Sequence, residues 1–187
     1  IKKIKKKNKF FENILSNSLI NNFNFKLTQD QERIIKEINN DLKSGNKMFR
    51  LLQGDVGAGK TIVSLIAASN VIESNFQTAF MAPTEILAKQ HYNLAKNIFK
   101  GTSIKIGFLT GKTKISDKKI VIDKLSNGKI NLLIGTHALF QKKVLFRNLG
   151  LVIIDEQHKF GVKQRLELAY KGGNDCDILL MSATPIP

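Results

Sequence analysis

Cysteine is almost absent from this chain: Cys176 is the single one among 187 residues. A lone cysteine excludes an internal disulfide and is typical of the reducing cytoplasm, where we expect this protein. A cysteine-based metal site would need further ligands that the sequence lacks, so we interpret Cys176 as an ordinary loop residue. No apolar stretch approaches the roughly 20 residues of a transmembrane helix. The basic opening IKKIKKKNKF is not followed by the apolar core of a signal peptide, and we expect no membrane partner.

Acidic residues are scarce relative to basic ones. The chain has 15 Asp and Glu against 30 Lys and Arg, which gives a formal net charge of +15. Such a balance favours a polyanionic partner, with nucleic acid as the leading candidate. The heavy use of Lys, Asn and Ile offers a competing explanation, because a biased genome composition also makes surfaces basic. Charge alone leaves both explanations open.

The chain divides into two parts by composition. Residues 1–25 are rich in Lys and Asn, and we interpret them as a basic linker or the end of a preceding domain. In residues 26–187, apolar runs alternate with amphipathic stretches, which is typical of a parallel sheet covered by helices on both faces. We therefore predict an α/β domain of three layers, α/β/α, around a mostly parallel central sheet. The expected strands are 48–53, 78–82, 104–109, 130–135, 151–154 and 178–182, and the expected helices are 30–43, 60–74, 85–99, 116–125 and 162–170.

A glycine-rich octapeptide, GDVGAGKT, lies between the first expected strand and the helix that follows it. It fits the phosphate-loop pattern G-x-x-x-x-G-K-[ST] at every fixed position, in the strand–loop–helix context that confirms the motif. The glycines let backbone N–H groups surround an anion at the positive end of a helix. Lys60 then reaches the β- and γ-phosphates, and Thr61 ligates Mg²⁺. The predicted nucleotide-binding residues are Gly54, Asp55, Val56, Gly57, Ala58, Gly59, Lys60 and Thr61.

Two acids, Asp155 and Glu156, directly follow the apolar run 151–154. In parallel α/β folds this places carboxylates at the ligand-binding edge of the sheet, beside the glycine loop. We predict that Asp155 holds Mg²⁺, directly or through water, and that Glu156 orients and deprotonates the attacking water. The alternative is that both acids are merely solvated residues at a strand end.

Gln31 precedes the glycine loop and has two possible roles. Its amide both donates and accepts hydrogen bonds, so it can read the edge of adenine. The spacing of Thr28 and Gln31 is also that of a helix-capping box. Adenine recognition is our expectation, although both roles can hold in part.

Small polar residues follow three further strands. Thr84 begins a helix after strand 78–82, Thr110 and Gly111 follow strand 104–109, and Thr136 follows strand 130–135. Helix starts and turns with exposed N–H groups bind nucleic-acid phosphates, so these positions predict a track for a single strand. Ordinary capping explains each of them when taken alone. At the last strand end, Ser182 and Thr184 are predicted to couple the nucleotide site to this track.

The ordered motifs GDVGAGKT, APTEILAKQH, TGK, GTHALF, DEQHKFGVKQR and SATPIP resemble the first RecA-like motor lobe of superfamily 2 helicases, most closely the RecG family. The resemblance covers residues 25–187, and DEQH continuing into FGVKQR is its most specific part. Lys159 stands where that family usually has Arg, a change of little effect unless the position makes a bidentate contact. The transcription-repair coupling factors share much of the pattern but usually carry a second Glu at the position of Gln157.

This resemblance implies an ATP-dependent DNA helicase, or branch-migration motor, with ATP and Mg²⁺ as cofactors. Forks and Holliday junctions would be its DNA partners in recombination and repair. It implies γ-phosphate sensing by Gln157 and His158, linked to Ser182 and Thr184. Gln31 would contact adenine, and DNA would contact Thr84, Thr110, Gly111 and Thr136.

The resemblance also implies a wedge domain and a second RecA-like lobe, which supplies an arginine finger and is absent from these residues. We expect a monomer, and a fragment, since the chain starts at Ile1 and stops at Pro187 inside a motif. The lobe would be truncated at its C-terminal end, and these 187 residues alone would have little activity. Two alternatives stay open: a non-catalytic ATP- or DNA-binding fragment, and a double-stranded DNA translocase of the coupling-factor type.

Overall fold

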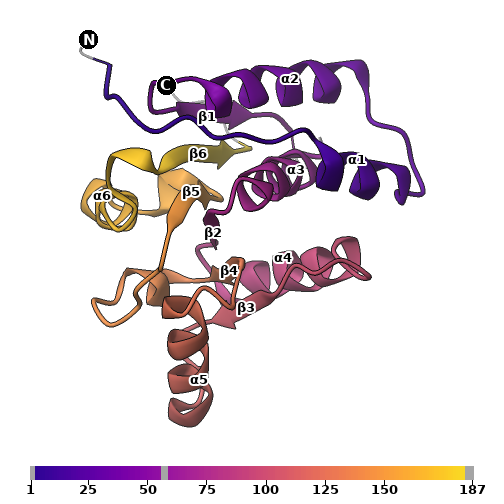
Figure 1. The fold of residues 1–187 in the computed structure, drawn as a ribbon. Helices are drawn as coiled ribbons and strands as arrows, with labels where there is room; N and C mark the ends of the chain where they lie inside the picture. The colour runs from indigo at the N-terminus through magenta and orange to yellow at the C-terminus, as the bar shows by residue number, and fades with distance from the viewer. Residues whose placement is uncertain (1–2, 56–58, 184–187) are drawn as a thin grey trace.

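The fold is that of a computed structural model, which describes residues 3–55 and 59–183. Its centre is a sheet of six strands in the order β1-β6-β5-β2-β4-β3, and every pairing between neighbours is parallel (Figure 1). The strands are β1 (Phe49–Gln53), β2 (Gln77–Met81), β3 (Ile106–Leu109), β4 (Leu132–Gly135), β5 (Leu149–Ile154) and β6 (Asp177–Ser182).

Helices cover both faces of this sheet (Figure 1). The longer helices are α1 (Ile14–Asn21), α2 (Gln29–Lys43), α3 (Lys60–Glu73), α4 (Glu85–Ile98), α5 (Ile115–Ser126) and α6 (Val162–Tyr170). Three short 3-10 helices are η1 (His137–Phe140), η2 (Gln157–Lys159) and η3 (Gly173–Asp175).

The core consists of two apolar layers, one on each face of the sheet. On one face, Phe80 of β2 and Ile153 of β5 pack with residues of α2, α3 and α4. On the other, Met81 and Ile154 pack with residues of α5, α6 and η1. Successive strand residues point to opposite faces, and here both faces are apolar, which explains the continuous apolar runs. The predicted three-layer α/β/α fold with a parallel sheet is confirmed.

All six expected strands and five expected helices are present, with ends that differ by at most two residues. Helix 162–170 has the bounds that the sequence predicts. Helix α1 was not expected, because residues 1–25 read as low-complexity sequence. Within the described ranges, no helix combines the length and the apolar character needed to cross a bilayer.

Residues 3–25 pack against the sheet and α3 rather than extending away from them. Lys6 Nζ lies 2.6 Å from Asp177 Oδ2, and Lys9 Nζ lies 2.7 Å from the same oxygen, with no exposure of any of the three side chains. Asp177 Oδ1 also accepts the Met48 backbone N–H at 2.7 Å. Burial lowers the pKa of Lys6, against the opposing hydrogen bond and charge of Asp177. One carboxylate at the start of β6 therefore joins the N-terminal segment to two neighbouring strands.

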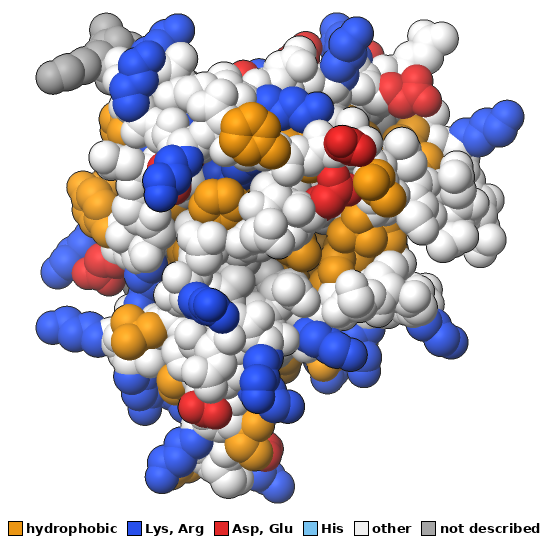
Figure 2. Space-filling view, in the orientation of Figure 1, with side chains coloured by type: hydrophobic (Ala, Val, Ile, Leu, Met, Phe, Trp, Pro, Cys, Tyr) orange, Lys and Arg blue, Asp and Glu red, His pale blue; other side chains and the backbone are white. Residues whose placement is uncertain are grey.

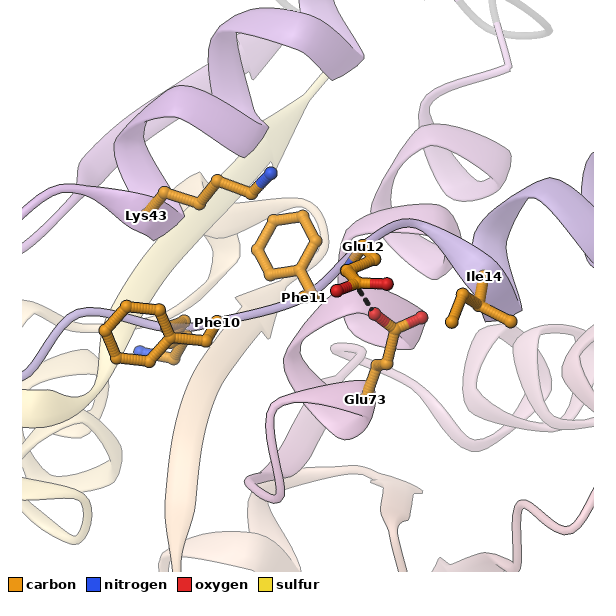
Figure 3. A pocket seen from close by; sticks show the side chains of 7 residues that line it. Phe10, Phe11, Glu12, Ile14, Lys43 and Glu73 are labelled. Atoms are coloured by element: carbon orange, nitrogen blue, oxygen red, sulfur yellow. Dashed lines mark hydrogen bonds between the residues drawn. The ribbon is translucent and has the colours of Figure 1, made fainter.

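The Glu73 carboxylate makes a second attachment, at the end of α3. It accepts the backbone N–H groups of Glu12 at 2.6 Å and Leu15 at 2.9 Å, which satisfies donors at the start of α1. Figure 3 shows Glu73 against the Glu12 backbone, in a hollow that Phe10 and Phe11 also line. The domain boundary at residue 25 stays a prediction, but α1 owes its position to contacts with α3.

Cys176 directly precedes β6 and is buried. Burial raises the pKa of its thiol to about 12, so it carries no thiolate near neutral pH. The sequence predicts a loop residue, and in the structure the side chain of Cys176 packs into the core.

Replacing Asp177 with Ala should strongly destabilise the chain. The change leaves Lys6 and Lys9 buried without their carboxylate, and removing one partner of a buried ion pair costs about 3–5 kcal/mol. Urea unfolding measures this loss. The matched control is Asp30→Ala, whose exposed pair with Arg33 should contribute less than about 1 kcal/mol. Equal losses in the two variants would contradict the structural role of Asp177.

Candidate functional site

The phosphate loop begins where β1 ends, beside β6. Gly54 N donates to Ser182 O at 3.3 Å, and Gly59 precedes α3 with a φ of 77°. Lys60 Nζ donates to two loop carbonyls, Gly54 O at 2.6 Å and Asp55 O at 2.9 Å. The ammonium group therefore lies over the loop, and Thr61 lies in the first turn of α3. The predicted residues Val56, Gly57 and Ala58 lie outside the described residues.

Gln31 lies against this loop. The capping box is present: Gln31 Oε1 accepts the Thr28 N–H at 2.9 Å, and Thr28 Oγ1 accepts the Gln31 N–H at 3.2 Å. A Cβ atom added at Gly59 would collide with the Gln31 amide nitrogen. The amide oxygen thus serves the cap while the amide nitrogen is directed to the phosphate loop. Adenine recognition by Gln31 stays a prediction.

The two acids follow β5, and a single strand, β6, separates β5 from the strand β1 that precedes the loop. Asp155 is 8% exposed, and its backbone N–H donates to Met81 O of β2 at 2.8 Å. Glu156 has a φ of 49°, a left-handed conformation that non-glycine residues adopt at a cost of about 1–3 kcal/mol. Such strain clusters at functional sites, which supports a role for the Glu156 carboxylate.

The residues after Glu156 turn back toward it. Gln157 and His158 belong to η2, and Lys159 N donates to Glu156 O at 2.9 Å. His158 Nε2 lies 3.5 Å from Glu156 Oε2. The chain thus brings Glu156 and His158 together, while γ-phosphate sensing by Gln157 and His158 stays a prediction.

His91 of α4 contacts the candidate site, although the sequence did not predict it there. Its Nε2 lies 2.6 Å from Asp155 Oδ2, and its ring centroid lies 4.7 Å from that of Phe80. A weak signal exists in the sequence, since Ala88, His91 and Ala95 form the buried stripe of α4 at helical spacing. A lone histidine in such a stripe does not reveal its partner, because that partner follows β5 and lies 64 positions away.

The strand order sorts the predicted residues into two groups. We call the side of the sheet at which the strands end, at their carboxyl ends, the carboxyl edge. The neighbouring strands β1, β6 and β5 bring the phosphate loop, Ser182 and Asp155 to one half of this edge. The strands β2, β4 and β3 bring Thr84, Thr136 and Thr110 to the other half. Ser182 is buried opposite Gln53 of β1. Thr184 lies outside the described residues.

The predicted DNA-facing threonines differ in exposure. Thr84 is exposed, and its Oγ1 accepts the Leu87 N–H at 3.2 Å as the N-cap of α4. Thr110 and Thr136 are only 3% and 2% exposed, and Thr110 Oγ1 accepts the Lys112 N–H. Gly111 is exposed in the turn that directly follows Thr110. The backbone N–H groups of both residues already donate within the fold, Thr110 N to Thr113 Oγ1 at 3.0 Å and Thr136 N to Leu109 O at 3.3 Å. Contact with DNA stays a prediction.

The basic side chains do not gather in one patch on the face shown in Figure 2. Lys and Arg are scattered there over several elements. This distribution does not by itself locate a nucleic-acid path.

The residues near the loop fit a magnesium–nucleotide complex. Among the described residues there is no group of three or more His, Cys, Asp or Glu that could hold a metal ion by itself. Asp155 and Thr61 would provide two oxygen ligands, and Mg²⁺ in such sites takes the others from phosphates and water. Lys60 Nζ, which donates to the carbonyl oxygens of Gly54 and Asp55, is placed to exchange them for phosphate oxygens.

A parallel sheet with a phosphate loop at one strand end and two acids at another defines an ATP-binding motor lobe of the RecA-like class. The DEAD/DEAH box helicase model matches residues 28–187, and the chain belongs to this family. Relatives of the RecG type confirm the resemblance inferred from the sequence. The chain is 52% identical over 179 residues to the ATP-dependent DNA helicase RecG of Thermotoga maritima, with 96% of this chain and 23% of that protein covered.

Solved structures agree with this assignment. A structure of RecG bound to a three-way DNA junction matches with a TM-score of 0.87 and 47% identity, covering 98% of this chain and 24% of that one. The DEAD-box helicase Mss116 bound to ssRNA and UDP-BeF matches with a TM-score of 0.73, 92% coverage of this chain and 39% of that one. Its identity of 22% supports the fold alone. The chain spans about a quarter of the length of the RecG proteins it matches.

Replacing Gly59 with Ala should weaken ATP binding at least tenfold. The new Cβ would collide with the Gln31 amide nitrogen, so the end of that side chain would have to move away from Gly59 and leave its place beside the loop. The control is Gly101→Ala, because Gly101 has a similar φ of 81° but no atoms within 4 Å of an added Cβ. Both changes carry the same backbone strain of about 1–2 kcal/mol. Titration with a fluorescent ATP analogue measures the affinity for ATP. An equal loss of affinity in both variants would show that backbone strain, and not the contact with Gln31, causes the effect.

Proposed function

We propose that this chain is the ATP-binding lobe of an ATP-dependent DNA helicase of RecG type, which drives branch migration on forked or junction DNA. The observation that carries the proposal is the placement of the Lys60 loop and the Asp155–Glu156 pair on β1 and β5, which flank β6. The RecG relatives and their junction complex support the choice of DNA as substrate. We place the protein in the cytoplasm, where its ATP and DNA would be found.

Each residue at the nucleotide site has a proposed task. Lys60 leaves the carbonyls of Gly54 and Asp55 and binds the β- and γ-phosphates. Thr61 and Asp155 hold Mg²⁺, which when bound neutralises the charge of the phosphates. Glu156 orients the attacking water and accepts its proton. Gln31 reads adenine through its amide.

The remaining residues would transmit the state of the nucleotide. Gln157 and His158 sense the γ-phosphate, and Ser182 with Thr184 links them to the DNA track. On that track, Thr84, Thr110, Gly111 and Thr136 contact the DNA backbone at the ends of β2, β3 and β4. The complete protein would act as a monomer, with a wedge domain and a second RecA-like lobe that supplies an arginine finger.

Lys60→Ala in the complete protein should abolish ATP-dependent unwinding of forked DNA while junction binding stays measurable. The change removes a charged donor to the transferring phosphate, a loss that costs about 100-fold or more in turnover. A gel-based unwinding assay and DNA-binding titrations measure the two properties. Lys100→Ala, an exposed lysine outside the site, is the control. Unwinding that survives Lys60→Ala would contradict the proposal.

Glu156→Gln should keep ATP binding and lose turnover by about 100-fold or more, because a general base contributes at least that factor. Gln preserves the size of the side chain but cannot accept the proton. Binding of a fluorescent ATP analogue and steady-state hydrolysis with forked DNA separate the two effects. Glu167→Gln, an exposed carboxylate on α6, is the control. Near-normal hydrolysis in Glu156→Gln would reject its role as the base and favour a non-catalytic binding module.

A further inference from the structure

The carboxyl edge of the sheet has a boundary between β5 and β2. The nucleotide residues follow β1, β6 and β5, and the predicted DNA residues follow β2, β4 and β3. The side chain of His91 crosses this boundary, because α4 follows β2 while the carboxylate that His91 contacts follows β5. It joins the two halves of the edge by a side-chain hydrogen bond.

We propose that His91 is a positioning residue that couples DNA at the start of α4 to the magnesium-binding carboxylate of Asp155. This inference rests on the proposed function, in which Asp155 holds Mg²⁺ and Thr84 contacts DNA. His91 itself touches neither ligand and acts through Asp155.

The geometry of the pair supports a directed contact. His91 Nε2 and Asp155 Oδ2 are 2.6 Å apart, and each residue is 8% exposed. Because an ionised carboxylate only accepts hydrogen bonds, the proton of this bond belongs to His91 Nε2. The ring of His91 packs on Phe80 of β2, which limits its freedom. Asp155 is thus held by its side chain to α4 and by its backbone N–H to Met81 O.

The helix that carries His91 begins at the predicted DNA contact. Thr84 caps α4 by accepting the Leu87 N–H, and His91 follows seven residues later, about 10 Å along the helix axis. Ala88, His91 and Ala95 share the buried stripe, so small side chains on both sides let the helix approach the sheet closely. A phosphate bound at the start of α4 would bias the position of the whole helix, and with it the hydrogen bond to Asp155.

A residue that hydrogen-bonds to a metal-binding side chain orients that side chain and changes its affinity for the metal. Removing such partners costs about 10- to 100-fold in metal affinity or activity. Coupling between two binding sites is reciprocal, so an effect of DNA on nucleotide binding must appear equally as an effect of nucleotide on DNA binding. A histidine that only fills the core would contribute to stability and leave this coupling unchanged.

The test compares three variants of the complete protein. His91→Phe keeps a ring to pack on Phe80 but loses the donor, and His91→Gln keeps a donor near the position of Nε2. Asn93→Ala, an exposed residue of the same helix, is the control. For each, the Kd for a synthetic three-way junction is measured without nucleotide and with Mg²⁺ and a non-hydrolysable ATP analogue. Thermal melting confirms that each variant is folded.

In the wild type and Asn93→Ala, we expect the nucleotide to change the junction Kd by a factor within the range of about 5 to 150 that is usual for coupled sites. In His91→Phe this factor should fall close to one. In His91→Gln it should lie between the wild-type factor and the factor of His91→Phe. The Mg²⁺ concentration for half-maximal binding of the analogue should rise about 10- to 100-fold in His91→Phe.

Two outcomes overturn the inference, and they are distinguishable. If the wild type binds both ligands and His91→Phe keeps both the wild-type factor and the wild-type Mg²⁺ requirement, only the role of His91 fails. If the wild type binds no nucleotide or no junction, the proposed function fails and this inference falls with it.

Discussion

Parallel hydrogen bonding of β5 to both β6 and β2 is the constraint on which the rest of the molecule depends. It brings the carboxyl ends of all the strands to one edge, so loops far apart in the sequence meet there. It also leaves both faces of the sheet apolar, and α3 with α4 on one side and α5 with α6 on the other keep those faces from water. The candidate site lies at this end of the sheet because the loops that carry its residues follow the strands there.

Two buried carboxylates lie at opposite ends of the strands, one at the amino end and one at the carboxyl end, and they differ in their partners. Asp177, at the amino end of β6, receives two lysine ammonium groups and a backbone N–H, an arrangement that satisfies it within the fold. Asp155, at the carboxyl end of β5, has the imidazole of His91 on Oδ2 and lies on the side of the phosphate loop. In a chain with so few acids, one serves the attachment of the N-terminal segment, and we propose that the other serves the nucleotide.

Much of the fold could be predicted because its elements are coded by local patterns. The apolar run 151–154 and the two acids after it predict a strand and its end, and α6 has its expected bounds. The segment before α2 could not be predicted, because α1 depends on Glu73 and the burial of Lys6 and Lys9 depends on Asp177. These partners lie 58 or more positions away, and no periodicity within residues 1–25 reports them.

The sequence by itself determined the class of the fold, and it predicted the phosphate loop and the acids of the candidate site, since each is a motif of neighbouring residues with its own chemistry. The tertiary structure alone decided the strand order and the separation of the edge into two halves. It also decided that Thr110 and Thr136 are buried and that His91 meets Asp155. The physical reason is that pairing between strands and burial depend on contacts across the whole chain, whereas a loop that curls around a phosphate depends on the conformational freedom of a few adjacent residues.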